Sequence, residues 1–393
     1  MKLIVIALTA GLLLGCTQTP ARSASSPPQP NANPSASPTA DAPVSPIADT
    51  TAIPPASPSP VTDLPLSAVG ISCRLPVVRW GTSGADYLSY QGGFVTFPSA
   101  TYQADPMGVI HTDSLTPNFV TEATPTLHGL PRTGPPFHDL AKKRWVPAAA
   151  AQTSPDGAFY AYSPLVIGSN PETPSVIHVV DIGSGKERAF AVPTPFHLLI
   201  TEFDGAGVYF SSIQPMGPPQ GVWRLDIATG SVSQLLKDSG VAMVRGGYAW
   251  LNRIDPRDPE GPRTGHSGAR SNSVVRVNLS TGQETVWYYA PGQQVFWEGF
   301  DADGRPIVGV NPGPDFKRAS IRVLSSPGDS GTVIYDGTGG LSLLGPQADG
   351  GRIWFGNERG IYVWMPGTGL QKVFAYTSPF PTSELMFPAG FCL

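Results

Sequence analysis

Residues 176–190, VIHVVDIGSGKERAF, hold two short runs of apolar and β-branched residues on either side of a turn, Gly183-Ser184-Gly185. Runs of this kind around a glycine-containing turn are typical of a β-hairpin. The pattern returns at 221–236 (GVWRLDIATGSVSQLL), at 273–289 (SVVRVNLSTGQETVWYY), at 360–374 (GIYVWMPGTGLQKVF) and, less clearly, at 321–335. The repeat predicts an all-β chain assembled from one recurring hairpin unit.

A second family of turns carries Asp-Gly or Gly-Gly in front of a hydrophobic run. Glycine is favoured in such tight turns because their positive φ is costly for other residues. From Gly157 to Gly350 the members of this family lie on average about 48 residues apart, and the glycines of the first family lie about 46 apart from Gly185 to Gly369. Both averages match the spacing of a four-stranded propeller blade. The members of this second family are Gly92-Gly93, Asp156-Gly157, Asp204-Gly205, Gly246-Gly247, Asp303-Gly304 and Asp349-Gly350.

The two interleaved families predict a β-propeller of about six four-stranded blades, with seven as the alternative. In each blade the Asp-Gly turn joins the first two strands, A and B, and the later glycine turn joins C and D. One blade starts at Cys73 and contains Gly92-Gly93, and an insertion at 111–143 follows it. The run 384–392 is left to pair with this first blade and close the ring. The other five blades are expected at about 145–190, 196–236, 241–289, 294–336 and 340–376.

The N-terminal part has a different composition. Residues 1–15 have a basic start and an apolar run too short to span a bilayer, which indicates a signal peptide. They end at Leu13-Leu14-Gly15-Cys16, which resembles a bacterial lipobox and implies that Cys16 carries lipid. Residues 16–68 are rich in Pro, Ser and Ala, which predicts a disordered tether. The propeller domain is expected at 69–393, outside the cytoplasm and anchored to the bacterial cell membrane through this lipid alone.

Some turn motifs carry a family resemblance. Thr153-Ser154-Pro155-Asp156-Gly157, followed by the run 159–162 (FYAY), resembles the SPDG turn of TolB-like and WD-repeat propellers. The turns after Asp181 and Asp226 are similar to the later hairpins of the same families, although the Trp-Asp dipeptide of true WD repeats is missing. The resemblance implies a TolB-like propeller, and such rings host binding modules, scaffolds and enzymes alike.

Two cysteines frame the expected propeller. Cys73 opens its first strand and Cys392 is the penultimate residue, in a chain with an export signal. Exported proteins favour disulfides. We therefore predict a Cys73–Cys392 disulfide that fastens the first blade to the end of the chain.

The sequence contains no recognisable motif for nucleic-acid binding, metal binding or catalysis. The net charge of −4 without a basic stripe argues against nucleic-acid binding. The chain has no HExxH, no Gly-x-Ser-x-Gly and no phosphate loop, so we expect no metal, no cofactor and no recognisable catalytic set. Asp315 and Glu358 could pair as carboxylates across blades. A lone Asp in an Asp-Gly turn is expected to bond its own backbone, and the recurrent tryptophans are expected to pack between blades.

The connections between strands B and C are longer and more varied than the other loops, and ligand sites are often built on such loops. In a propeller of this topology, the B–C connections lie on the same face of the ring as the connections from one blade to the next. We infer a monomeric binding or scaffold module for a protein or polysaccharide partner on that face. The alternative is a carbohydrate-active or other hydrolase or lyase that uses the axial funnel. The candidate residues of the face are Arg253, Asp255, Arg257, Asp258, Arg263, His266, Asn311, Asp315, Arg318, Asn357, Glu358 and Arg359.

The first testable prediction concerns Cys16. Replacing it in Cys16→Ala removes the thiol that would carry lipid, so the protein should leave the membrane fraction or remain unprocessed. Detergent phase partitioning and the mass of the mature N-terminus measure this. Unchanged partitioning and processing would show that Cys16 is not the anchor.

Overall fold

The computed structural model describes residues 64–67, 70–82, 88–110, 126–127, 130–131, 136–140, 142–163, 175–194, 197–213, 219–258, 271–312, 318–338, 347–357, 359–375 and 385–393. All of them belong to one compact unit, 57–393. The signal peptide, Cys16 and nearly all of the predicted tether lie outside the described residues. Within the described ranges, no helix is long and apolar enough to cross a membrane.

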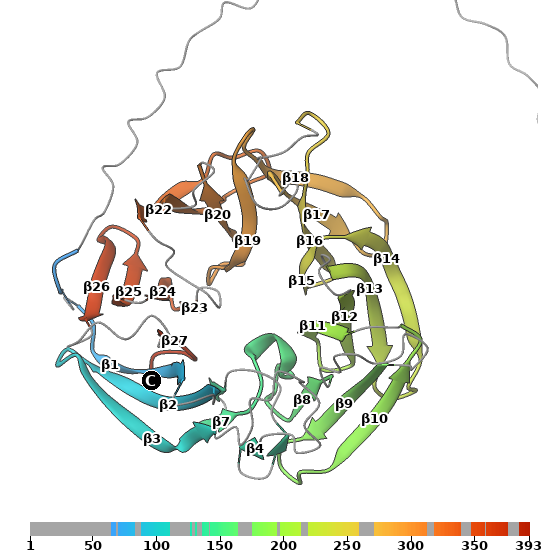
Figure 1. Ribbon diagram of the computed structural model, residues 1–393, viewed down its shortest axis with the longest axis horizontal. Coiled ribbons are helices and arrows are strands. Elements are labelled where there is room, and N and C mark those ends of the chain that lie inside the picture. Colours follow the sequence, from blue (N-terminus) through green and yellow to red (C-terminus); the bar gives the residue numbers. More distant parts are fainter. Residues whose placement is uncertain are drawn as a thin grey trace, which may run out of the picture. The chain divides into compact units, whose positions relative to one another are not determined.

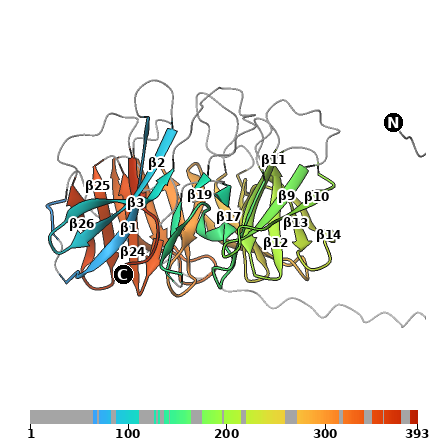
Figure 2. The same cartoon turned by 90° about the horizontal axis from the view of Figure 1, so that it is seen from below.

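Six antiparallel sheets surround a common axis in the described part of the chain (Figure 1). Five of them contain four strands each, and Figure 2 shows the ring from the side. In four of these sheets the strands follow chain order from the inside of the ring to the outside, as the repeat predicts. The fold is a β-propeller. The four sheets are β11(His197–Phe203), β12(Gly207–Ile213), β13(Pro219–Asp226) and β14(Val232–Ser239); β15(Val241–Arg245), β16(Tyr248–Arg253), β17(Ser273–Asn278) and β18(Glu284–Tyr289); β19(Gln294–Phe300), β20(Pro306–Asn311), β21(Arg318–Val323) and β22(Thr332–Thr338); and β23(Gln347–Asp349), β24(Arg352–Asn357), β25(Gly360–Met365) and β26(Gly369–Ala375).

The first blade closes the ring. Its order is β27-β1-β2-β3, so its innermost strand comes from the C-terminal end of the chain. Strand β27 pairs antiparallel with β1 from Val77↔Pro388 to Trp80↔Leu385, as predicted for the run 384–392. The strands of this blade are β1(Cys73–Thr82), β2(Leu88–Phe97), β3(Thr101–Ile110) and β27(Leu385–Pro388).

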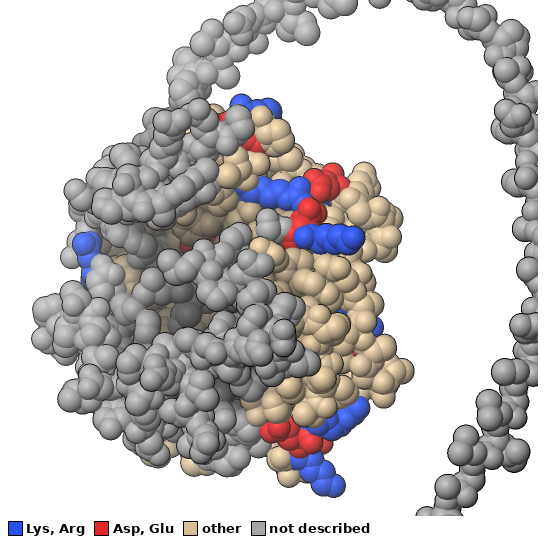
Figure 3. All heavy atoms as spheres, turned by 45° about the vertical axis from the view of Figure 1, so that its right-hand side comes forward, with Lys and Arg blue, Asp and Glu red and all other residues tan. Residues whose placement is uncertain are grey.

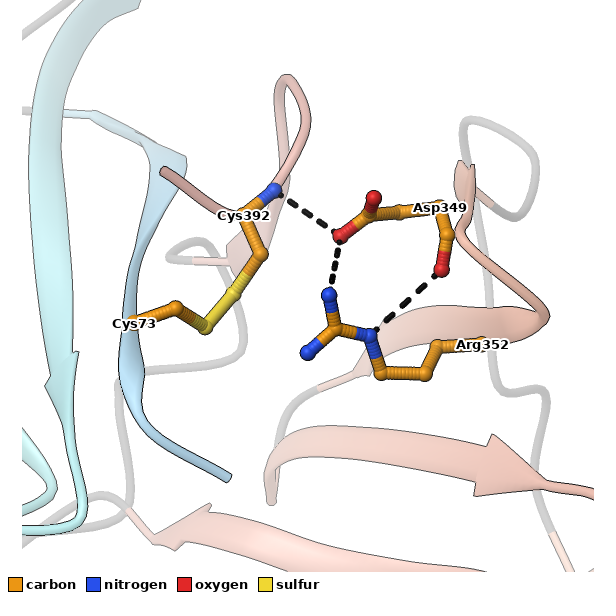
Figure 4. The surroundings of a disulfide bond; sticks show 4 residues. All are labelled: Cys73, Asp349, Arg352 and Cys392. Atoms are coloured by element: carbon orange, nitrogen blue, oxygen red, sulfur yellow. Dashed lines mark hydrogen bonds and ion pairs between the residues drawn. A yellow bond between two sulfur atoms is a disulfide. The ribbon is translucent and has the colours of Figure 1, made fainter. Parts of the chain in front are cut away.

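A disulfide reinforces this closure. Cys73 and Cys392 are bonded with their Cα atoms 5.7 Å apart, which confirms the predicted pairing (Figure 4). The backbone N–H of Cys392 donates to Oδ2 of Asp349 at 3.1 Å, and Nη2 of Arg352 donates to the same carboxylate oxygen at 3.0 Å. Asp349 belongs to the last blade, so its carboxylate ties the C-terminal segment to the blade that precedes it in the chain.

The position of Gly92-Gly93 was predicted wrongly. Both residues lie within strand β2 and not in a turn between strands A and B. Because β27 supplies strand A of this blade, no A–B turn exists in its sequence. A Cβ at Gly92 would lie 2.9 Å from the indole of Trp145, and one at Gly93 would lie 2.6 Å from the ring of Tyr102. Glycine here allows close packing rather than a turn.

The second blade is incomplete. It has three strands, in the order β10-β9-β8, and the predicted first strand is replaced by a short 3-10 helix, η1(Ala150–Gln152). Thr153 makes one antiparallel bridge to Tyr160 at the inner position. The strands of the blade are β8(Phe159–Tyr162), β9(Ser175–Asp181) and β10(Glu187–Val192).

Two small hairpins separate the first and second blades, where the sequence predicts an insertion. Trp145, assigned from sequence to the second blade, belongs to the second of these hairpins and packs against Phe94 of the first blade at 5.9 Å between ring centroids. The hairpins are β4(Thr126–Leu127) with β5(Leu130–Pro131), and β6(Phe137–Asp139) with β7(Arg144–Val146).

The repeated turns follow from local hydrogen bonds. Asp226 Oδ1 accepts the backbone N–H groups of Ala228 and Thr229 at 3.1 and 2.8 Å, and Asn278 plays the same part in the next blade. In the other turn family Asp156 and Asp204 accept backbone N–H groups two residues further on. The prediction that a lone turn Asp bonds its own backbone is confirmed at these positions.

We expect the disulfide to contribute strongly to stability. It closes a loop across a sequence separation of 319 residues, for which the chain-entropy model gives on the order of 5–6 kcal/mol as an upper figure. Cys392→Ser should therefore lower the Tm by roughly 10 °C in scanning calorimetry. Reducing the parent chain with dithiothreitol should lower its Tm to the same extent, while Cys392→Ser should not respond to the reductant. Equal melting of Cys392→Ser and the oxidised parent chain would contradict this role.

Candidate functional site

A cavity of about 860 Å³ lies at the axis of the ring. The ends of four innermost strands line it, and Figure 1 shows these strands, β11, β15, β19 and β23, facing the centre. Residues 149–151 of the second blade and Phe391, after β27, complete the wall. The described lining comes from 201–203, 243–245, 297–302 and 347–350 in the other blades.

Strand direction places this cavity at one end of the ring. Its lining residues lie where each strand A runs into the turn toward strand B. The predicted binding residues lie at the opposite end, as Arg253 shows, because it ends the B strand β16 and pairs with Ser273 at the start of the C strand β17. The sequence prediction and the described cavity thus concern different faces of the propeller.

Three of the inner strands carry an irregularity beside the cavity. The pairing register shifts between Ile200 and Glu202 in β11, between Val241 and Met243 in β15, and between Trp297 and Gly299 in β19. Such β-bulges bend a strand and re-aim side chains, and they are common next to functional sites. Glu298 is the extra residue of the third bulge.

The Glu298 carboxylate is the unusual group in the cavity. No described residue forms a hydrogen bond or ion pair with it, and burial alone raises its pKa from 4.5 to about 8. Glu202 lies on the same wall and accepts the N–H of Gly246 at 3.3 Å. Burial is also the main cause that raises the pKa of Glu202, with Asp204 adding to it and Arg245 opposing it. Glu298 is partly exposed to the cavity, and a carboxyl group with a raised pKa and no partner is a candidate for binding or proton transfer.

The other acids of the cavity are already neutralised. Asp301 forms an ion pair with Arg305 at 2.6 Å, and Asp349 forms one with Arg352 at 3.0 Å. Glu298 and Glu202 are therefore the carboxyl groups on this wall that remain for a ligand.

Aromatic rings stand beside these acids. Trp297 and Phe300 pack edge to face with ring centroids 5.4 Å apart, and the guanidinium of Arg245 lies 4.6 Å from the Phe300 ring centroid. Nε1 of Trp297 is buried without a hydrogen-bond partner. Apolar walls with a few convergent polar groups are typical of ligand pockets, and such walls can hold a sugar ring or a peptide side chain.

The residues of the predicted binding face have structural partners where they are described. Arg253 pairs with Asp238 and Glu284 at 2.8 and 2.7 Å, Arg257 with Asp255 at 2.7 Å, and Arg318 with Asp336 at 2.7 Å. In Figure 3, basic and acidic side chains likewise lie next to each other on the side of the molecule that faces the viewer. Because these arginines are already paired with carboxylates, fewer unpaired charges remain to bind a partner than the sequence suggests.

Amide and carboxylate groups of the same face stabilise its backbone. Asp258 accepts the N–H of Gly292 at 2.9 Å, Asn357 accepts the N–H of Arg359 at 2.8 Å, and Asn311 ends strand β20. Arg263, His266, Asp315 and Glu358 lie outside the described residues. The proposed pairing of Asp315 with Glu358 therefore has no structural description.

The described residues contain no group of three or more His, Cys, Asp or Glu side chains able to hold a metal ion.

The sequence analysis did not identify Glu202 and Glu298 as candidate site residues. Their signal is an acidic residue within a hydrophobic run just before an A–B turn, as in 198–204 (LLITEFD) and 295–301 (VFWEGFD).

No model of a known protein family matches the chain, and no curated protein sequence matches it. Solved structures similar to it include TolB from Acinetobacter baumannii, at 14% identity and a TM-score of 0.39, over 80% of this chain and 63% of that one. They also include an oligogalacturonate lyase in complex with manganese (11% identity, TM-score 0.43, 78% and 80% of the two chains). A third is the β-propeller domain of the trilobed protease from Pyrococcus furiosus (12% identity, TM-score 0.41, 77% and 86%). At these values no activity or partner carries over to this chain.

The raised pKa of Glu298 predicts a pH-dependent stability. Its folded pKa of about 8 lies above its usual 4.5, so the stability it contributes is full below pH 4.5 and is lost as the pH rises to 8. The loss is about 1.4 kcal/mol for each pH unit in that window. Glu298→Gln, which cannot ionise, should therefore gain stability relative to the parent chain as the pH rises from 5 to 8.

Urea unfolding across this pH range measures the difference, with Asp303→Asn as the control, because the Asp303 side chain is 76% exposed and Arg305 keeps its closer partner Asp301. Taking the difference between variant and parent removes the titration of the other acids. A Glu298→Gln difference that does not change with pH would show that this carboxyl group is ionised in the folded state.

Proposed function

We propose that the chain is a ligand-binding propeller, held outside the cytoplasm by lipid on Cys16, and that its axial cavity receives part of a protein or polysaccharide partner. The observation that carries this proposal is the unpaired Glu298 in a cavity of about 860 Å³. Burying a carboxyl group without a partner costs free energy. A ligand that donates a hydrogen bond or carries positive charge would remove that cost.

The geometry favours part of a larger molecule over a small free metabolite. The cavity is walled by several blades and by the segment after β27, so one entering group contacts parts of the chain far apart in sequence. Trp297 and Phe300 offer apolar contact, while Glu298 and Glu202 offer acceptors once ionised. Such a combination suits a sugar unit or a basic side chain on a partner.

A second candidate function is the hydrolase or lyase alternative. A carboxyl group with a pKa of about 8 is protonated at neutral pH, as a general acid must be. Glu202 would then be the second carboxyl group that glycoside cleavage requires. Turnover of polysaccharide by the parent chain, lost in Glu298→Gln with retained melting temperature, would favour the enzyme.

Site-specific photo-crosslinking tests the binding proposal. A photoreactive residue replaces Ala302, which is exposed and lines the axial cavity, or Ala228, which is exposed in an outer turn of the third blade. In intact cells, we expect an adduct from position 302 that is absent from position 228 and is reduced in Glu298→Gln. Equal labelling from both positions, or none from 302, would contradict a ligand in the cavity.

A further inference from the structure

A second cavity, of about 560 Å³, lies away from the axis on the circumference of the ring. It is bounded by strand β3 of the first blade, by the β6–β7 hairpin, and by the turn 182–185 of the second blade. Figure 1 shows β3 and β7 next to each other at this junction. We call this cavity the junction groove, and the axial site does not share its walls.

His138 is the buried polar group of the junction groove. Its side chain is 5% exposed, and its ring packs edge to face against Phe94 and Trp145, each at 5.3 Å between centroids. Its Nδ1 is buried and has no hydrogen-bond partner. Such groups are rare in folded proteins because a buried polar atom without a partner loses its hydrogen bonds to water and gains none in return.

Burial lowers the pKa of His138 from its usual 6.5, with Asp105 and Asp139 opposing this effect and Arg74 adding to it. The shift favours the neutral form of the ring. A neutral imidazole has one donor and one acceptor nitrogen. His138 can therefore bond to a ligand without carrying charge itself.

Two cations and one carboxylate line the junction groove, so its net charge is positive. Asp105 keeps its negative charge, but both of its oxygens accept hydrogen bonds, Oδ2 from Nε1–H of Trp145 at 2.9 Å and Oδ1 from the backbone N–H of Met107 at 3.0 Å. Lys143 and Arg144 line the groove, and neither has a carboxylate partner among the described residues. Nε of Arg144 is buried without a partner as well.

Local contacts shape the backbone of the turn that carries Lys143 and Arg144. Lys143 has a φ of 50°, a left-handed conformation that is costly for a residue other than glycine. The neighbouring Asp139 Oδ1 accepts the N–H of Lys142 at 2.6 Å, which fixes the tip of the hairpin. A backbone hydrogen bond attaches the β6–β7 hairpin to the propeller: the backbone N–H of His138 donates to the carbonyl oxygen of Ala389 at 2.7 Å.

We propose that the junction groove binds a small organic anion, with its acidic group between Lys143 and Arg144, a hydrogen bond to His138, and its apolar part against Trp145 and Ile182. Lys143 and Arg144 supply charge-assisted hydrogen bonds, which are stronger than neutral ones. The site is independent of the axial cavity and of its ligand.

Benzoate and benzylamine are matched probes for this site, because they share a ring and differ in charge. The readout is the indole N–H resonance of Trp145 in the full chain, assigned with Trp145→Phe. We expect benzoate to shift this resonance in a saturable way and benzylamine to leave it in place. Equal shifts with both probes, or no saturable shift with benzoate, would overturn the proposal.

Variants of the cations complete the test. Lys143→Ala and Arg144→Ala should each weaken benzoate binding by about tenfold, while Lys237→Ala, an exposed lysine of β14 in the third blade, should leave it unchanged. Lys143 is exposed, so its removal is not expected to impair folding. Unchanged benzoate affinity in Lys143→Ala and Arg144→Ala would contradict the assigned role of these side chains. The hydrogen-bond partner of His138 Nδ1 would then be a water molecule and not an anion.

Discussion

The pairing of β27 with β1 is the interaction on which the ring depends. It joins residues from opposite ends of the folded unit, and without it the first blade would expose the edge of β1. The disulfide Cys73–Cys392 and the Asp349 carboxylate lie next to this pairing and bind the C-terminal segment to both neighbouring blades. Closure also determines the order of strands in the first blade, since the first strand of the domain has to take the second position.

The same closure shapes both cavities. The segment after β27 brings Phe391 to the wall of the axial cavity, and Ala389 accepts the hydrogen bond that attaches the β6–β7 hairpin. Because that hairpin lies between the first and second blades, it forms the junction groove and places Trp145 over Gly92. One strand pairing thus positions the walls of two separate sites.

The two cavities differ in the charge that the fold leaves unpaired. In the axial cavity Asp301 and Asp349 are neutralised by arginines, and Glu298 remains alone at a bulge. In the junction groove the two cations Lys143 and Arg144 outnumber the one carboxylate, Asp105, whose oxygens accept N–H groups of Trp145 and Met107. These differences arise from local partners, so the net charge of −4 says nothing about either site.

The sequence by itself determined the repeating unit, the location of the turns at Asp156, Asp204 and Asp226, the closing strand and the disulfide. Those features depend on local patterns, such as an Asp that bonds its own turn, or on the placement of two cysteines. The tertiary structure alone decided that Gly92 serves packing against Trp145 and that described arginines of the predicted face are paired. It also decided that the Glu298 carboxylate and Nδ1 of His138 find no hydrogen-bond partner among the described residues. Pairing and burial depend on which blades become neighbours, and residues far apart in the chain meet only when the ring has closed.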